Sequence, residues 1–410
     1  MIRTRAWLRY IVFTIICAVG LYAFPGSTEI DAQIFAINIG IDRLENGMMR
    51  VTVQMPSGED DGASASSGNS KSDESDDEQD EHSKQLKRAQ QIQQQSKQSG
   101  YLIATADGVN FRDALNIMTA TLPRLLNMSQ VKQIVFSEAF AYDPEFMDLV
   151  EFMVNRNSIY NAAQIAICLG SAEEFIREQN LILGARLSKA QDAAWYAHQL
   201  AGFVPETHIS DIYYAAHSGY CDGMAALCAT NMFTSEVSSN VDASGTVYAG
   251  QISRSGANLN EYMGSALFGP NGMVGRLTGY ETQLAQMIRG EIVGMLYMSN
   301  GRTTELNPRA KPDVAIDLSK DIPRISISVK LYMQIDDASP SVQDIRTQLE
   351  RELLELVQKC QNMGVEPFGL GKKAVRQFLT FEDWNNCHWR DRFAQADVGI
   401  SVDIEPIDAA

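Results

Sequence analysis

The five histidines are the first residues of this sequence that could carry catalytic or metal-binding chemistry. They are His82, His198, His208, His217 and His388. None of them belongs to an HExxH motif, and no Cys-x-x-Cys pair accompanies them, so their spacing indicates no zinc site. His217 precedes a serine, but the Gly-x-Ser-x-Gly turn that exposes a nucleophile is absent there. We therefore predict no catalytic residue and no metal ligand.

A glycine-rich segment at residues 369–374 is the second candidate, because it matches the pattern Gly-x-Gly-x-x-Ala. Dinucleotide-binding proteins place this pattern directly after a strand. Here it follows a long helical stretch, and the sequence contains no phosphate-binding Gly-x-x-x-x-Gly-Lys-Ser/Thr loop. The sequence therefore predicts no cofactor and favours a protein that is not an enzyme.

Six cysteines occur, none of them in a metal-binding spacing. Cys17 lies in an apolar N-terminal run, whereas Cys168 falls in a strand pattern and Cys360 on the apolar stripe of a helix. We expect the last two to be small buried hydrophobic residues. Cys221 and Cys228 are close enough in sequence for a local disulfide, and free thiols are the alternative.

Aromatic residues cluster in the middle of the chain. The cluster comprises Trp195, Tyr196, Tyr213, Tyr214 and Tyr220. Packing in a core or an interface is the commoner use of such residues, and we favour it here. The alternative is a groove that binds a small ligand or a partner helix.

The first half of the chain has the pattern of alternating strands and helices, which must position the candidate residues that lie there. Apolar periodicity predicts strands at 35–41, 50–55, 102–105, 131–136 and 161–169. It predicts helices at 111–126, after an N-cap at Asp143, and after a capping box of Ser171 and Glu174. This order indicates an α/β layer with some parallel strand pairing.

The middle and last thirds of the chain continue with further strands and helices. We expect a helical stretch at 187–218, a strand at 246–252, a loop at 256–264, a hairpin of 266–268 with 273–277, and a helix at 280–288. A strictly alternating strand at 325–335 precedes a helix capped by Ser341 and Asp344, and a strand at 398–404 follows. The natural assembly is a long helix on a mostly antiparallel sheet.

The segment between that long helix and the last strand is rich in glycine and aromatic residues. Gly364 is placed to end the helix, and we expect strain from a β-carbon at Gly369 or Gly371 wherever φ is positive. Three aromatic side chains should cover the end of the helix, and these are Trp384, Trp389 and Phe393.

The net charge of −17 argues against nucleic acid and anionic lipid as direct surface partners. Much of this charge is local, because ten acidic residues and one lysine lie between Ser57 and Glu81. Residues 57–99 contain almost no apolar side chains, so we predict a disordered acidic and Gln-rich insertion. A solvated loop without function is the favoured interpretation, and the alternative is an acidic arm that binds a basic partner or, loosely, divalent cations.

The N-terminus has the pattern of a targeting segment. Arg3, Arg5 and Arg9 precede an uncharged run from Tyr10 to Phe24. The run has the length of a signal-peptide core, and with residues 6–8 it approaches the length of a membrane-spanning helix. A cleaved signal peptide and an uncleaved anchor both remain open, and both send the following residues across the membrane.

Three groups of motifs carry a resemblance to a known family. The first is Glu29-Ile30 with the strands at 35–42 and 49–54, and the second is residues 264–268 with 273–278 and Glu281. The third is Val365-Glu366-Pro367-Phe368-Gly369-Leu370-Gly371 with the aromatic residues and strand that follow it. Together, and in this order along the chain, they resemble the Ger(x)C family of spore germination proteins.

This resemblance implies an α+β protein of three domains outside the membrane, with mixed sheets and packed helices. We assign residues 1–26 to a signal peptide or anchor, 27–186 to an N-terminal domain interrupted at 57–99, 187–300 to a middle domain and 301–410 to a C-terminal domain. The family lipobox cysteine would fall near Phe24, and Ile16 before Cys17 does not suit a lipobox.

The resemblance also implies a function, which is that of a non-catalytic C subunit of a nutrient germinant receptor. Its partners would be the two polytopic A and B subunits, and its location the extracytoplasmic face of the spore inner membrane. A membrane-anchored solute-binding or adhesion protein is the alternative.

Overall fold

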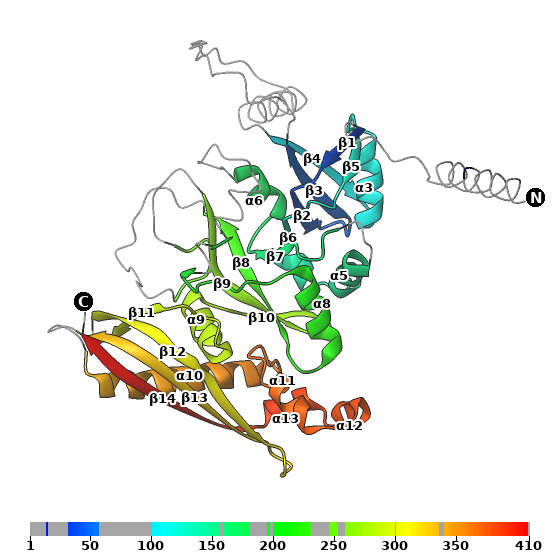
Figure 1. Cartoon of the computed structure of the whole chain (residues 1–410). Coiled ribbons are helices and arrows are strands. Elements are labelled where there is room, and N and C mark those ends of the chain that lie inside the picture. Colours follow the sequence, from blue (N-terminus) through cyan, green and yellow to red (C-terminus); the bar gives the residue numbers. More distant parts are fainter. Residues whose placement is uncertain are drawn as a thin grey trace, which may run out of the picture.

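A computed structural model gives the fold, and it describes residue 14 and residues 32–56, 101–155, 159–179, 195–196, 200–231, 246–252, 259–299, 301–335 and 340–408. Figure 1 shows an upper body of strands flanked by helices and, below it, a long curved sheet backed by one long helix. The fold is α+β, as the sequence predicts. In the part described, no helix is long and apolar enough to cross a membrane, and the N-terminal apolar run lies outside that part apart from Thr14.

The strands are β1 (Gln33–Phe35), β2 (Asn38–Arg43), β3 (Met49–Pro56), β4 (Tyr101–Gly108), β5 (Leu125–Asn127), β6 (Gln133–Ser137), β7 (Gln164–Cys168), β8 (Gly223–Thr230), β9 (Asn260–Gly269), β10 (Gly272–Leu277), β11 (Met295–Ser299), β12 (Arg302–Asp317), β13 (Arg324–Ile335) and β14 (Asp397–Asp408). The helices are α3 (Phe111–Thr119), α4 (Glu138–Ala141), α5 (Phe146–Asn155), α6 (Ala172–Glu178), α8 (Ile209–Ser218), α9 (Gly279–Arg289), α10 (Val342–Asn362), α11 (Gly371–Ala374), the 3-10 turn η2 (Val375–Gln377), α12 (Phe381–Asn386) and α13 (Trp389–Ala394).

One mixed sheet forms the upper body, with the strand order β10-β9-β8-β7-β6-β2-β3-β4. Its central strands β2, β6, β7 and β8 pair in parallel, and antiparallel strands flank them on both sides. Helices α3, α5 and α8 belong to the core on one face, and α6 belongs to the core on the other. Both faces of the central strands are thus covered, as parallel pairing requires.

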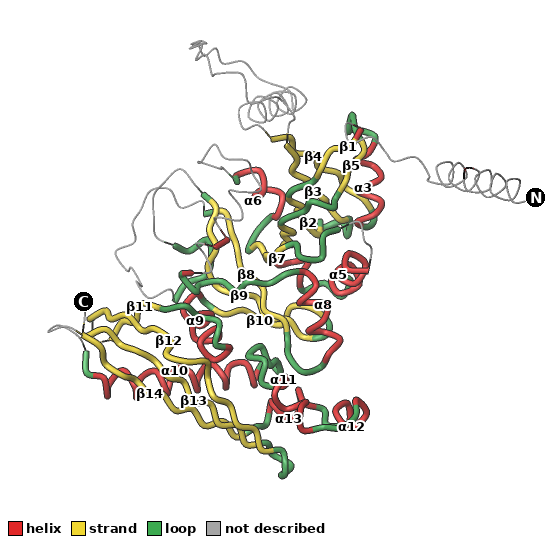
Figure 2. Tube along the Cα trace, in the orientation of Figure 1, coloured by secondary structure: helices red, strands yellow, loops and turns green. Residues whose placement is uncertain are grey.

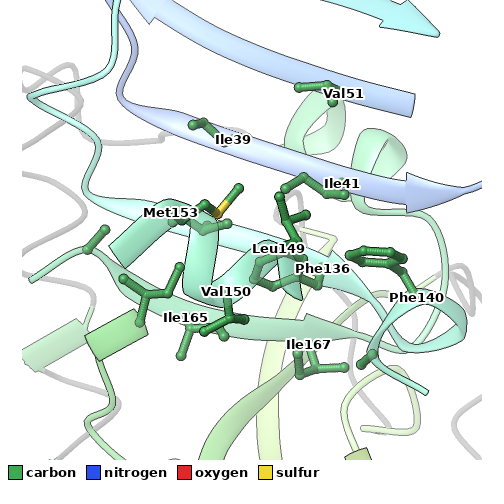
Figure 3. Close-up of a cluster of buried hydrophobic side chains, with 14 of the residues drawn as sticks. Ile39, Ile41, Val51, Phe136, Phe140, Leu149, Val150, Met153, Ile165 and Ile167 are labelled. Atoms are coloured by element: carbon green, nitrogen blue, oxygen red, sulfur yellow. The ribbon is translucent and has the colours of Figure 1, made fainter. Parts of the chain in front are cut away.

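The core of this body consists of apolar side chains from the sheet and from α4 and α5 (Figure 3). Ile39, Phe136 and Phe146 are completely buried, and the rings of the two phenylalanines meet edge to face. Every second side chain of β2 and of β6 therefore enters this core, which is why the alternating apolar pattern in the sequence predicted the two strands correctly.

The second sheet has the order β11-β12-β13-β14 and lies against α10. Pairs β11–β12 and β12–β13 are antiparallel, but β13 and β14 are parallel. Helix α9 lies between the two sheets, since it contacts β9 and β10 as well as β12 and β13 (Figure 2). A third core surrounds α9 and joins both sheets.

Several local predictions are wrong. The helix predicted at 111–126 ends at Thr119, and residues 125–127 form β5, which pairs with β1. Residues 246–252 form no strand, because Gly250 turns the chain with φ +83°. Residues 201–208 are not helical, and β9 begins at Asn260 inside the predicted loop.

Helix starts also differ in detail from the predictions. The helix predicted to start after Asp143 begins at Phe146. Ser171 caps α6 as predicted, but no reciprocal bond from Glu174 is present, and the carboxylate of Asp42 accepts from the N–H groups of Ala172 at 2.8 Å and Glu173 at 2.9 Å. Ser341 stands at the N-cap of α10 without a capping side-chain bond. A residue distant in sequence therefore supplies the main cap of α6.

The predicted domain boundaries can be compared with the sheets. The eight-stranded sheet runs across position 186, with β2, β3, β4, β6 and β7 before it and β8, β9 and β10 after it. Strand β11 precedes position 301 but belongs to the C-terminal sheet. The three-domain division stays a prediction.

The pairing of β3 with β4 predicts that residues 57–100 are dispensable for folding. Pro56 and Tyr101 are register partners, so the two strands end side by side. Replacing residues 57–100 by a four-residue Asn-Gly hairpin loop should raise the free energy of unfolding by about 2 kcal/mol, because each doubling of loop length costs about 0.6 kcal/mol of closure entropy. Urea denaturation of both proteins measures the difference, with a Gly/Ser segment of the original length as control. A loss of more than about 2 kcal/mol in the Gly/Ser control would show that the native segment packs on the body.

Candidate cleft at the junction of the two sheets

A cleft with a volume of about 790 Å³ opens where the upper body meets the C-terminal domain. One wall is α8 with the residues that precede it, and another is the end of α9 with the segment after it. Lys372 of α11 completes the lining. The lining residues are Tyr196, Leu200, Glu206, Thr207, His208, Asp211, Ile212, Tyr214, Ala215, Ser218, Tyr220, Cys221, Asp222, Gly223, Met224, Gln286, Arg289, Glu291, Val293 and Lys372.

The structure divides the predicted aromatic cluster between cleft and core. Tyr196, Tyr214 and Tyr220 line the cleft, and the first two are 63% and 59% exposed. Trp195 is buried against Tyr262 with 5.0 Å between the ring centroids, and Tyr213 packs on the main core. The predicted packing role thus holds for Trp195 and Tyr213, and the alternative groove role fits Tyr196 and Tyr214. Tyr220 lines the cleft and also packs against the core around α9.

Two pairs of oppositely charged groups lie on the wall of the cleft, His208 with Asp211 and Arg289 with Glu291. His208 Nδ1 lies 3.3 Å from Asp211 Oδ2, and this contact raises the pKa of His208 and lowers that of Asp211. Arg289 Nε lies 2.6 Å from Glu291 Oε2, and its Nη1 donates to the carbonyl oxygen of Pro367 at 2.7 Å. Arg289 therefore links the end of α9 to the segment between α10 and α11.

Asp222 lines the cleft, and together with buried Glu366 and half-buried Arg390 it forms a group here called the carboxylate joint. The backbone N–H of Glu366 donates to Asp222 Oδ2 at 2.7 Å, and the N–H of Asp222 donates to the carbonyl oxygen of Glu366 at 2.8 Å. Arg390 Nε donates to Asp222 Oδ1 at 2.6 Å. The joint connects the start of β8 to two segments of the C-terminal domain.

The side chain of Glu366 is completely buried and points back to its own loop. Its two carboxylate oxygens accept from the N–H groups of Leu370 and Gly371, each at 3.1 Å. Burial raises the pKa of Glu366 to about 7, because the low dielectric disfavours the charged form and Asp222 adds repulsion. Burial also raises the pKa of Asp222, against the lowering effect of Arg390.

Close packing explains the glycine and the aromatic residues of this region. A β-carbon on Gly371 would lie 2.3 Å from the carbonyl oxygen of Tyr220 and 2.6 Å from Nε1 of Trp389. Trp384, Trp389 and Phe393 are all buried, as predicted from the sequence. Gly364 and Gly369 have φ of +70° and +75°. The backbone strain that was predicted for a side chain therefore applies at Gly369. At Gly371 a side chain is excluded because neighbouring atoms leave no room for a β-carbon.

The remaining chemical candidates lie apart from one another. His217 Nδ1 donates to the carbonyl oxygen of Tyr213 at 2.8 Å, and His388 stands at the N-terminus of α13. His82 and His198 lie outside the described residues. Cys221 and Cys228 are free thiols, so the possible disulfide is absent. Across the ranges that the structure describes, no three His, Cys, Asp or Glu residues form a cluster suited to a metal ion.

Sequence reasoning missed Asp222, Arg289 and Arg390 as residues that build this site. Glu366 was noted within a motif, but nothing in the sequence links it to Asp222, which is 144 positions away. The only signal in the sequence is the position of Glu366 between a long helix and a turn that contains proline and glycine. An acidic side chain at such a position is usually exposed to solvent, so its burial could not be predicted. The arrangement as a whole can hold a ligand or a partner segment between two units whose relative position the joint fixes.

Comparison with known families places two spore germination domains in this chain. The family described as "Spore germination protein N-terminal domain" matches residues 72–228, and "Spore germination B3/ GerAC like, C-terminal" matches residues 263–407. The first match begins after β3, so the opening strands that carry part of the resemblance lie outside it. Among curated proteins no significant match is found.

A solved structure is similar to this chain over nearly its whole length. It is the crystal structure of the GerBC protein, with a TM-score of 0.50 and 14% identity, and the match covers 90% of this chain and 96% of that one. At this identity the likeness shows a shared fold.

The raised pKa of Glu366 predicts that the Glu366→Gln variant changes the pH dependence of stability. The folded wild type holds a proton on Glu366 up to about pH 7, whereas the unfolded chain loses it near the ordinary value of 4.5. Wild-type stability therefore falls as the pH rises through this window, by at most about 1.4 kcal/mol per pH unit from this group. The variant lacks this loss, so its free energy of unfolding relative to the wild type should rise from pH 5 to pH 7.

Urea denaturation at several pH values measures this difference, and Glu382→Gln, at an exposed carboxylate, is the control. If the free energies of unfolding of wild type and Glu366→Gln change in parallel with pH, the raised pKa of Glu366 is contradicted.

The packing around Gly371 predicts large losses of stability from two substitutions. Trp389→Ala removes a buried aromatic side chain and should cost about 3–5 kcal/mol. Gly371→Val should be comparably harmful, since its β-carbon meets backbone at 2.3 Å. The matched controls are Phe381→Ala, at an 81% exposed side chain, and Gly399→Val, where nothing lies within 4 Å.

Denaturation should use the chain from residue 27 onward, because residues 302–410 alone would lack β11 and Tyr220. If Trp389→Ala keeps its stability but loses assembly with partners, Trp389 is a docking residue and the core assignment is wrong.

Proposed function

Since the chain belongs to the Ger(x)C family of spore germination proteins, we propose that it is the C subunit of a nutrient germinant receptor. The observation that carries the proposal is the presence of both germination domains in their family order. The fold shared with the GerBC protein over 90% of this chain supports it.

The proposed role is assembly and signal coupling without catalysis. Asp222 and Glu366 are buried and Arg289 is half-buried, and each is bound to backbone or to an opposite charge. Such groups fix the position of one unit against another, which suits a protein that transmits a change between partners. Catalytic groups instead need a polar atom directed at a substrate.

We place the protein on the extracytoplasmic face of the spore inner membrane, with two polytopic subunits as partners. The basic residues before the apolar run support this orientation, because positive charge stays on the cytoplasmic side. Nucleic acid is not a partner in this proposal, since the net charge is −17.

Affinity capture of the full-length protein from detergent-solubilised spore membranes tests the proposal. Two polytopic proteins should be recovered with it in constant proportion, and deletion of the chain should abolish the response of spores to a nutrient. Recovery of the chain alone, together with a normal nutrient response in the deletion strain, would refute it.

A second candidate function is solute binding by an anchored extracytoplasmic protein, and the 790 Å³ cleft with its three tyrosines favours it. Isothermal calorimetry of the purified full-length chain in detergent distinguishes the two. Tight binding of a small molecule that is lost in Tyr214→Ala would support solute binding.

The anchor prediction concerns Cys17. Because Ile16 does not suit a lipobox, we expect attachment through the apolar run up to Phe24. Cys17→Ser should leave the share of protein in the membrane fraction unchanged. Labelling by radioactive palmitate that disappears in Cys17→Ser would contradict this prediction.

A further inference from the structure

The connection from α3 to β5 carries an unusual exposed apolar surface. Ile117 is 44% exposed and Leu125 is 56% exposed, and the residues between them, Pro123 and Arg124 among them, are mostly exposed as well. We call Ile117, Pro123, Arg124 and Leu125 the tether face. Single exposed apolar residues are common, so the position of the face must decide what it does.

The pairing of β5 with β1 places the tether face next to the first strand of the fold. Leu125 is the register partner of Gln33, and Leu126 is the partner of Ile34, which is only 8% exposed. Because side chains alternate along a strand, Leu125 points away from the core that Ile34 enters. Figure 1 shows β1, β5 and α3 together at the end of the upper body far from the C-terminal sheet.

The distance from the apolar N-terminal run to this face is limited by the chain itself. The run ends at Phe24 and the described fold begins at Ala32, so seven residues, 25–31, connect them. Fully extended, this connection spans at most about 28 Å. If the run is held in a bilayer, β1 and the adjacent Leu125 stay within that distance of the lipid surface.

Local charge does not oppose contact with a lipid surface at this place. No acidic residue occurs between Asp113 and Glu138, a stretch that contains Arg124 and Lys132, although the whole chain has a net charge of −17. The connecting residues carry Glu29 and Asp31 and balance these two positive charges. Apolar contact is therefore the main attraction, with Arg124 placed to reach lipid phosphates.

We propose that the tether face rests on the outer surface of the membrane, with Ile117 and Leu125 at the level of the headgroups. This inference rests on the anchored location given under the proposed function. It directs the C-terminal sheet and the cleft away from the bilayer, toward the space where other partners or solutes are met.

Site-specific fluorescence on the full-length protein tests this orientation. Leu125→Cys, in a Cys17→Ser background, is labelled with the environment-sensitive dye nitrobenzoxadiazole, and Ser401→Cys on exposed β14 is the matched control. The other cysteines, Cys168, Cys221, Cys228, Cys360 and Cys387, are buried, and the Cys17→Ser parent gives their background labelling. The protein is reconstituted into vesicles of phosphatidylcholine, alone or mixed with phosphatidylglycerol.

The expected result is a blue shift of the dye at position 125 and quenching by a lipid-attached nitroxide at least about twofold stronger than at position 401. Arg124→Glu should weaken that quenching in the vesicles that contain phosphatidylglycerol. If the protein floats with both kinds of vesicle but the dye at 125 stays as water-exposed as at 401, the membrane contact is refuted and the anchored receptor role stands.

If the protein does not float with the vesicles, the anchor itself fails, and with it both this inference and the proposed location. If the dye at 125 shifts only when spore membrane proteins are added to the vesicles, a protein partner covers the tether face and the lipid contact is refuted.

Discussion

The carboxylate joint is the interaction on which the rest of the structure depends. Asp222 and Glu366 exchange two backbone-directed hydrogen bonds, and Arg390 neutralises Asp222. Through these bonds the start of β8 holds the loop after α10, and that loop in turn binds Arg289 at the end of α9. Buried carboxylates are costly unless every oxygen is satisfied, so this group tolerates little displacement of one sheet against the other.

The same joint connects stability with the shape of the cleft. Asp222 of the joint lines the cleft, and the walls come from α8 on one side and the end of α9 on the other. A change in the position of the C-terminal domain would therefore change the cleft, and a ligand in the cleft would bias that position. Such reciprocity suits a subunit that couples partners, and it requires no chemistry on a substrate.

Strands and helices with a strict apolar period could be predicted from the sequence, whereas those held by distant contacts could not. The alternation at 325–335 gave β13, and the stripe after Ser341 gave α10. The 16 residues of β12 escaped, because Pro308 and Pro312 interrupt the pattern and two register shifts accommodate them. Residues 246–252 look like a strand, but they only run beside β9 and turn at Gly250.

For the site, the aromatic cluster and the packed closing block could be predicted from the sequence, but the joint could not. Tyr196 and Trp195 are neighbours in sequence, and only tertiary packing decides that one lines the cleft and the other enters the core. Asp222 and Glu366 meet because two sheets pack on α9, a contact that no local pattern encodes.

The parallel pairing of β13 with β14 has a consequence for the biogenesis of the protein. The upper sheet is complete once the chain has been made through Leu277, but β13 obtains its second neighbour only when residues 397–408 are available. During synthesis from the N-terminus, the upper body can fold while the C-terminal half is still being made. The carboxylate joint can form only afterwards, when Glu366 and Arg390 have been added. The contact between the upper body and the C-terminal sheet is therefore completed last.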